Sequence, residues 1–169
     1  MKNIILIGMP GSGKSTVGYL LSEKLNLNFI DMDDYIEKTE NKSIKELFEI
    51  SENNFRDAET RCSYILSKTN SNIIAAGGGI VKRKENIDAF EENSIIIFLN
   101  RPIEDIIQDI ETKNRPLLKD GKEKLHELYK ERLHLYKQYC HIEILNNKTA
   151  LDAVDNIYNG LLNYRKSGE

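Results

Sequence analysis

Short runs of apolar residues alternate along this chain with longer segments in which apolar positions recur at helical spacing. Three of the runs, at residues 4–7, 73–76 and 95–99, are almost continuously apolar, which is typical of strands covered by helices on both faces. The alternation predicts an α/β fold built on a parallel sheet. The expected strands are Ile4–Ile7, Asn28–Asp31, Ile73–Ala76, Ile95–Leu99 and Ile142–Leu145.

Polar residues mark where several of the helices begin. Ser43 followed by Glu46 has the spacing of a capping box, and Thr149 with Asp152 is a weaker version of the same signal. Pro102 follows the fourth strand, and we expect it at the first helical position, where its missing N–H costs nothing.

One connection is longer than the others. Segment 113–121 is polar, contains Arg115-Pro116 and ends in Asp120-Gly121, so we expect a loop of about nine residues between two helices. A loop of that length is a candidate lid. The chain has no repeat and no linker, and we therefore expect a single domain over residues 1–169.

The strongest chemical signal is Gly8-Met9-Pro10-Gly11-Ser12-Gly13-Lys14-Ser15, which has P-loop spacing between a strand and a helix. Its glycines let backbone N–H groups wrap phosphate oxygens, and the helix N-terminus adds positive charge. Lys14 is expected to reach the β- and γ-phosphates and the Ser15 hydroxyl to ligate Mg²⁺. The sequence thus predicts a site for a nucleoside triphosphate with Mg²⁺. The expected ATP-binding residues are Gly11, Ser12, Gly13, Lys14, Ser15 and Thr16.

The chain does not have the elements of a GTPase. The closest match to a guanine-binding Asn-Lys-x-Asp element is 147–150, with alanine in place of the carboxylate, and no Asp-x-x-Gly occurs anywhere. Adenine is therefore the expected base, and 169 residues suit a small-molecule kinase better than a motor. A non-catalytic ATP-binding regulatory domain is the alternative from another class.

Carboxylates follow the second strand, and three glycines follow the third. Asp31 and Asp33 are two residues apart, so on an extended chain both side chains point into the site at the carboxyl end of the sheet. One can hold Mg²⁺ or its waters, and the other can accept a proton from an acceptor hydroxyl. Asp34 is expected to start a helix over Tyr35–Lys38. The alternatives are a solvated acidic helix cap and, for Gly77-Gly78-Gly79, a merely flexible loop.

Composition makes the arginines informative. The chain has 24 basic and 27 acidic residues, a net charge of −3, and only seven arginines against 17 lysines. This balance argues against binding to nucleic acid or to an anionic membrane.

No apolar run approaches the roughly 20 residues of a membrane span. Cys62 and Cys140 are expected to be idle thiols in a reducing compartment, so we expect a cytoplasmic protein.

Three arginines stand at places that suggest anion recognition. Arg56 and Glu59 flank the apolar stripe of a helix over Ser51–Leu66, although an exposed ion pair worth less than about 1 kcal/mol is the alternative. Arg132 lies on the apolar face of its helix, where an unpaired charge is costly, so it should meet an anion. Arg115, in the lid segment, can swing toward phosphate.

Taken in order, these motifs are similar to those of the shikimate kinase family over essentially the whole chain. The matching segments are the P-loop with Thr16-Val17-Gly18, Phe29-Ile30-Asp31-Met32-Asp33, Phe55-Arg56-Asp57-Ala58-Glu59, Gly77-Gly78-Gly79, Arg115-Pro116-Leu117-Leu118 and Arg132-Leu133-His134-Leu135-Tyr136. The resemblance implies a three-layer P-loop kinase fold with a five-stranded parallel sheet in the order 2-3-1-4-5 and a mobile lid at about 113–121. It also implies Mg²⁺-dependent transfer of the ATP γ-phosphoryl group to the 3-hydroxyl of shikimate, in the biosynthesis of chorismate and aromatic amino acids.

The resemblance further implies a role for each matched residue. Asp33 would bind the acceptor hydroxyls as the catalytic carboxylate, assisted by Lys14 and by Arg115 from the lid. Asp31, through water, and Ser15 would hold Mg²⁺.

On the substrate side, Arg56 and Arg132 would bind the shikimate carboxylate with the backbone of Gly78 and Gly79, and Glu59 would hold Arg56. A helical segment at about 33–62 would carry much of this site. The expected partners are ATP and shikimate, and the expected state is a monomer.

The adenine side departs from the family pattern. Many members have an arginine at the start of the lid region, where this chain has Gln108, with Lys113 as a possible substitute. The late loop, which often carries another arginine, reads Asn146-Asn147-Lys148 here. A related gluconate or nucleoside monophosphate kinase would explain the P-loop and lid, but not Arg56, the triple glycine and Arg132 together.

Overall fold

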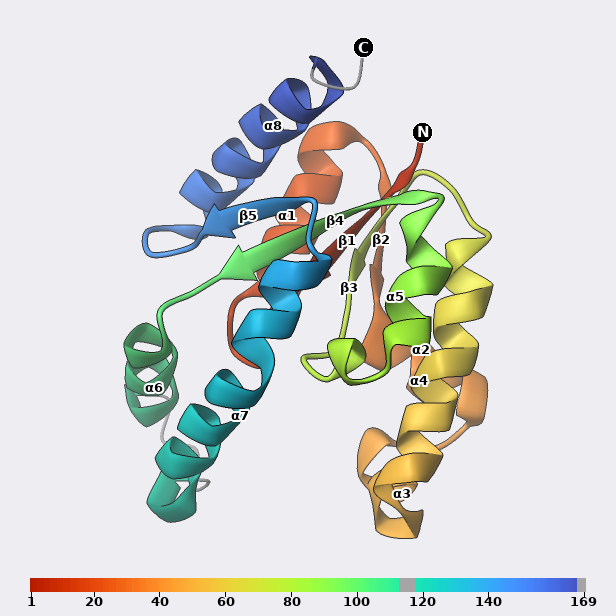
Figure 1. Ribbon diagram of the computed structural model, residues 1–169, viewed down its shortest axis with the longest axis vertical. Helices are drawn as coiled ribbons and strands as arrows, with labels where there is room; N and C mark the ends of the chain where they lie inside the picture. Colours follow the sequence, from red (N-terminus) through yellow and green to blue (C-terminus); the bar gives the residue numbers. More distant parts are fainter. Residues whose placement is uncertain (113–117, 167–169) are drawn as a thin grey trace.

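Five parallel strands form one sheet in the order β2-β3-β1-β4-β5, the order that the family resemblance implies (Figure 1). The computed structural model describes residues 1–112 and 118–166. Each observed strand lies within one residue of its predicted ends. The strands are β1 (Asn3–Ile7), β2 (Asn28–Asp31), β3 (Asn72–Ala75), β4 (Ser94–Asn100) and β5 (Ile142–Leu145).

The sheet is covered on both faces because its central strands are apolar on both sides. In β1, Ile4 and Leu6 face one core, whereas Ile5 and Ile7 face the other. The first core packs against α1 (Lys14–Leu25) and α8 (Ala150–Lys166). The second packs against helices on the opposite face, which are α2 (Met32–Glu40), α4 (Glu52–Ser67), α5 (Lys84–Glu91) and α7 (Leu118–Tyr139). This arrangement confirms the predicted α/β fold.

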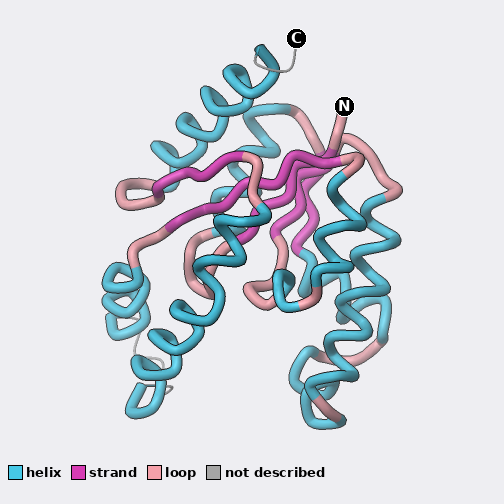
Figure 2. Tube along the Cα trace, viewed as in Figure 1, coloured by secondary structure: helices cyan, strands magenta, loops and turns pink. Residues whose placement is uncertain are grey.

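Two helical groups extend beyond the sheet (Figures 1 and 2). One contains α2, α3 (Ile44–Ile50) and α4, and the other contains α6 (Ile103–Thr112) and α7. Both predicted capping boxes are confirmed. Ser43 and Glu46 exchange hydrogen bonds at the start of α3, and Thr149 and Asp152 do the same at the start of α8.

Three predicted boundaries were wrong. Pro102 precedes α6, and its carbonyl oxygen accepts the Ile106 N–H, so it caps the helix instead of occupying the first helical position. Helix α2 begins at Met32 and not after Asp34, because the Asp31 side chain caps it. Helix α7 begins at Leu118, so the predicted loop does not extend to Gly121. The remainder of the predicted lid, 113–117, lies outside the described residues.

Both cysteines are free thiols, as predicted. None of the helices in the described ranges combines the length and hydropathy that crossing a membrane requires.

The pairing of β4 with the segment before β5 depends on a histidine ring. His141 donates its backbone N–H to the carbonyl oxygen of Ile96, and its Nδ1 accepts the Ile96 N–H at 2.9 Å. His141 is exposed, but the groups packed against its ring partly desolvate it and so lower its pKa below the usual value. A protonated Nδ1 cannot accept a hydrogen bond, so charging the ring opposes this pairing.

We expect the free energy of unfolding to decrease as the pH falls through the interval below about 6.5, because the unfolded state there binds a proton that the folded state resists. His141→Asn keeps an acceptor and does not titrate, so urea titrations at pH 7.5 and 5.5 should show a smaller decrease, by up to about 1 kcal/mol. His126→Asn, at an exposed position, is the matched control and should behave as wild type. Equal pH slopes for wild type and His141→Asn would contradict this interpretation.

Candidate active site

The predicted P-loop connects β1 to α1 at the carboxyl edge of the sheet. Gly13 is the N-cap of α1 with φ 92°, in the left-handed region that favours glycine. A Cβ on Gly8 would lie 2.7 Å from the carbonyl oxygen of Leu99, so a side chain there would collide with the backbone of β4. The glycines therefore give the loop its shape and let it pack against the neighbouring strand.

Lys14 is buried beneath this loop. Its Nζ donates to the carbonyl oxygens of Gly8 at 3.0 Å and Met9 at 2.8 Å. Burial lowers its pKa to about 8, while the carboxylates of Asp33 and Asp31 act in the opposite direction. The ammonium group is thus held at the loop by neutral oxygens, with two carboxylates close enough to influence it.

Ser15, Asp31 and Asp33 form a connected polar group. The Ser15 hydroxyl donates to Asp31 Oδ2 at 2.6 Å, and Asp31 Oδ1 accepts the Asp33 N–H at 3.0 Å. We expected Asp31 and Asp33 to lie on an extended segment, with both side chains on the same side. This expectation was wrong, because the chain turns into α2 at Met32. Asp31 is a helix cap, as the alternative interpretation held, and it is also the partner of Ser15.

Asp33 nevertheless faces the site from the first turn of α2. Its Oδ1 would lie 3.1 Å from a Cβ on Gly77. Burial is the main cause that raises its pKa, the charge of Asp31 adds to the effect, and Lys14 opposes it. A carboxylate with a raised pKa is a better proton acceptor.

Arg56 and Glu59 form a buried ion pair, so the alternative of an exposed pair is wrong. Arg56 Nη1 lies 2.7 Å from Glu59 Oε2, and the two residues are 7 % and 1 % exposed. Burial raises the pKa of Glu59, and the charges of Arg56 and Arg132 oppose that shift. The charge of Arg132, on α7, thus acts on the same carboxylate that pairs with Arg56.

The triple glycine is a packed segment and not a flexible loop. A Cβ on Gly79 would lie 2.3 Å from Arg56 Nη2, and one on Gly78 would lie 2.7 Å from the ring of Pro10. The segment therefore lies between Arg56 and the P-loop. The absence of side chains is what lets these groups approach each other.

Arg132 is buried on the inner face of α7, as its spacing predicts. It is 6 % exposed, and its Nε has no hydrogen-bond partner within the part of the chain that the structure describes. One turn further on, the hydroxyl of Tyr136 donates to the carbonyl oxygen of Gly78 at 2.5 Å. The Tyr136 ring stacks on Phe98, and burial raises the pKa of its hydroxyl to about 12. Tyr136 thus fastens the glycine segment to α7.

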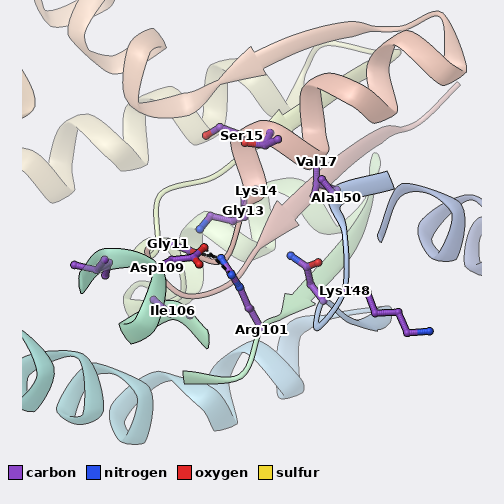
Figure 3. A pocket seen from close by; sticks show the side chains of 13 residues that line it. Gly11, Gly13, Lys14, Ser15, Val17, Arg101, Ile106, Asp109, Lys148 and Ala150 are labelled. Carbon is purple, nitrogen blue, oxygen red and sulfur yellow. Dashed lines mark hydrogen bonds and ion pairs between the residues drawn. The ribbon is translucent and has the colours of Figure 1, made fainter. Parts of the chain in front are cut away.

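A pocket of about 530 Å³ extends from the P-loop toward α6 and the loop after β5 (Figure 3). Arg101, at the carboxyl end of β4, reaches across it to the carbonyl oxygen of Gly11 at 3.2 Å and to Asp109 at 2.7 Å. Lys148 also lines the pocket, with its side chain directed away from Arg101 in Figure 3. Thr16, among the predicted ATP-binding residues, lies in the same wall.

Sequence reasoning missed Arg101. Its signal was available, since it is one of seven arginines and directly follows a predicted strand, where ligands of parallel sheets bind. Gln108 does not line this pocket. Lys113 and Arg115 lie outside the described residues.

The comparisons with known proteins agree with this geometry. The family model described as shikimate kinase matches residues 10–161. The chain is 51 % identical to a shikimate kinase of Clostridium beijerinckii, over 92 % of each chain, and 46 % identical to one of Clostridium botulinum, over 96 % of this chain and 99 % of the other. It is also similar to a solved shikimate kinase from Acinetobacter baumannii in complex with shikimate. That likeness has a TM-score of 0.88 and 34 % identity, and covers 96 % of this chain and 94 % of the other.

The lowered pKa of Lys14 predicts an upper pH limit for binding of a phosphate-bearing nucleotide. Phosphate groups are ionised above about pH 7, so the change beyond that pH comes from the protein. As the pH rises through about 8, Lys14 loses its proton in the free protein, and the Kd for ATP should rise by up to about tenfold per pH unit. Calorimetric titrations from pH 7.5 to 9.5 measure this slope.

Lys14→Arg serves as the control, because arginine stays protonated over this range. The Kd of this variant for ATP, whatever its absolute value, should change less with pH than that of wild type. A wild-type Kd that stays constant up to pH 9.5 would show that Lys14 does not lose its charge there.

Proposed function

The chain belongs to the shikimate kinase family, and from this membership and the geometry of its site we propose that it transfers the ATP γ-phosphoryl group to the 3-hydroxyl of shikimate. The products would be ADP and shikimate 3-phosphate. The observation that carries the proposal is a pair of buried arginines at the glycine segment, since Arg56 packs against Gly79 and Arg132 lies one turn before Tyr136, which bonds Gly78.

This group of charges suits a small carboxylic acid. Both guanidinium groups have an Nε without a hydrogen-bond partner among the described residues, but Arg56 has ion pairs with Glu59 and Glu52, and among the described residues Arg132 has none. A buried, incompletely paired guanidinium is costly, so an entering carboxylate that pairs with it gains more than it would in water. Gly79 packs directly against the Arg56 guanidinium, so the backbone of the glycine segment and this arginine would face the acid together.

ATP would bind at the P-loop, with its phosphates over Gly11–Ser15 and its base in the pocket that Arg101 crosses. Backbone N–H groups at the start of α1 and the positive end of that helix favour phosphate there. Arg115 remains a predicted contact of the transferring phosphoryl group, supplied by the part of the predicted lid that precedes α7 and lies outside the described residues.

The residues present fit Mg²⁺. The Ser15 hydroxyl and the Asp31 carboxylate lie 2.6 Å apart and offer only oxygen, and Mg²⁺ prefers oxygen ligands while it retains several waters. Ser15 would bind the ion directly and Asp31 through water. When bound, Mg²⁺ would neutralise phosphate charge.

Catalysis would consist mainly of positioning and charge stabilisation, because phosphoryl transfer has a loose transition state. Asp33 would orient the 3-hydroxyl of shikimate and accept its proton as the new oxygen–phosphorus bond forms and the bond to ADP breaks. Lys14 and Arg115 would stabilise the charge on the transferring group. Closure of the lid would exclude water and limit hydrolysis of ATP.

For the protein as a whole, we propose a monomeric enzyme of the cytoplasm whose partners are ATP and shikimate. Neither nucleic acid nor a membrane enters the reaction, in keeping with the net charge of −3.

An assay of ADP release tests this function. With ATP and Mg²⁺ present, shikimate should stimulate ADP release at least about a hundredfold over the background without acceptor, whereas gluconate and AMP should not. Of these three acceptors, only shikimate combines a carboxylate that can pair with the buried arginines and a ring hydroxyl that can lie at Asp33. Stimulation by gluconate or AMP but not by shikimate would defeat the proposal, and release that no acceptor stimulates would favour a regulatory ATP-binding domain.

Replacement of Arg132 by lysine tests the carboxylate contact. Lysine keeps the charge but cannot make a bidentate pair, so the KM for shikimate should rise about tenfold or more while the KM for ATP changes less than about threefold. Arg61→Lys is the matched control, because Arg61 pairs with Glu40 on the exposed side of α4 and should leave both constants unchanged. An unchanged KM for shikimate in Arg132→Lys would remove this residue from the contact.

A further inference from the structure

A buried asparagine from the loop after β5 contacts the P-loop at a single peptide. Asn146 is 7 % exposed, and its Nδ2 donates to the carbonyl oxygen of Ser12 at 2.9 Å. Its own backbone N–H donates to the carbonyl oxygen of Asn100 at 2.8 Å, which fixes it to the end of β4. Because a carbonyl oxygen only accepts, the contact also determines which end of the side-chain amide faces the loop.

The orientation of that peptide determines where the next N–H points. No cis peptide bond occurs among residues 1–112 and 118–166, and in a trans peptide the C=O and N–H point in opposite directions. A Ser12 carbonyl turned toward Asn146 therefore directs the Gly13 N–H away from Asn146. Among the described residues, this N–H has no acceptor.

The Asn146 amide restrains this peptide from outside the loop. Rotation of the Ser12–Gly13 peptide changes ψ of residue 12 and φ of residue 13, and glycine tolerates either sign of φ. Gly13 has φ 92°, and Gly11 on the other side of Ser12 has φ 79°. The Ser12 N–H donates to the carbonyl oxygen of Met9 and the Gly13 carbonyl oxygen accepts from Val17, and the Asn146 amide adds the restraint on the Ser12 carbonyl itself.

We propose that Asn146 is a positioning residue of the nucleotide site, which holds the Ser12–Gly13 peptide so that the Gly13 N–H faces bound phosphate. The proposal depends on the proposed function in one respect only, that this loop binds the phosphates of ATP. It assigns Asn146 no contact with the base and no part in binding shikimate.

Asn146→Leu removes the donor without adding charge. We expect its Kd for ADP to rise about tenfold or more, and its Kd for inorganic tripolyphosphate to rise by a similar factor, since the loss concerns phosphate alone. The Kd for shikimate, measured by calorimetry without nucleotide, should stay within about twofold of wild type and shows that the variant is folded. Asn147→Leu, at the exposed neighbouring position, is the matched control and should change none of the three constants.

Three results would overturn the inference. The first is an unchanged Kd for ADP in Asn146→Leu. The second is a loss confined to ADP and absent with tripolyphosphate, which would place Asn146 at the base. The third is a Kd for shikimate that rises as much as that for ADP, which would mean a general loss of structure. Failure of the wild-type protein to bind either phosphate compound would instead contradict the proposed function.

Discussion

The burial of cations at the carboxyl edge of the sheet is the constraint on which the rest of this site depends. Lys14, Arg56 and Arg132 are each less than a tenth exposed, and a buried charge without partners costs several kcal/mol. Lys14 is therefore surrounded by carbonyl oxygens, and Arg56 is paired with Glu59. Arg132 is satisfied least, and this local shortage of negative charge favours a small anion although the chain as a whole is acidic.

The need to compensate these buried cations also explains why the backbone of the glycine segment is packed so closely. The groups that compensate these charges come from different parts of the chain, and they meet only because Gly77, Gly78 and Gly79 have no side chains. Asp33 and Glu59 approach the first of these glycines, Pro10 the second and Arg56 the third. The hydroxyl of Tyr136 then fixes the segment to α7. The substrate side and the nucleotide side are thereby built against one shared stretch of backbone.

The sequence was sufficient where a signal is local. The strands, both capping boxes, the P-loop and the inward face of Arg132 all follow from spacing within one element, and the structure agrees with each. It was insufficient where a contact joins distant residues. Arg101 reaches Gly11 across 90 positions and Asn146 reaches Ser12 across 134, and no periodicity reports such distances. The error at Asp33 has a different cause, because the Asp31 cap starts α2 directly after the predicted strand, where we expected extended chain as far as Asp34.

Burial also shifts the two groups closest to the chemistry toward their neutral forms, since it lowers the pKa of Lys14 and raises that of Asp33. Negative charge on bound phosphate favours a proton on both groups, so it raises both pKa values. Lys14 then becomes more firmly charged, as a phosphate ligand must be, and Asp33 becomes a stronger proton acceptor. In the proposed reaction, the charge that Mg²⁺ leaves on the nucleotide would therefore act on both sides of the site.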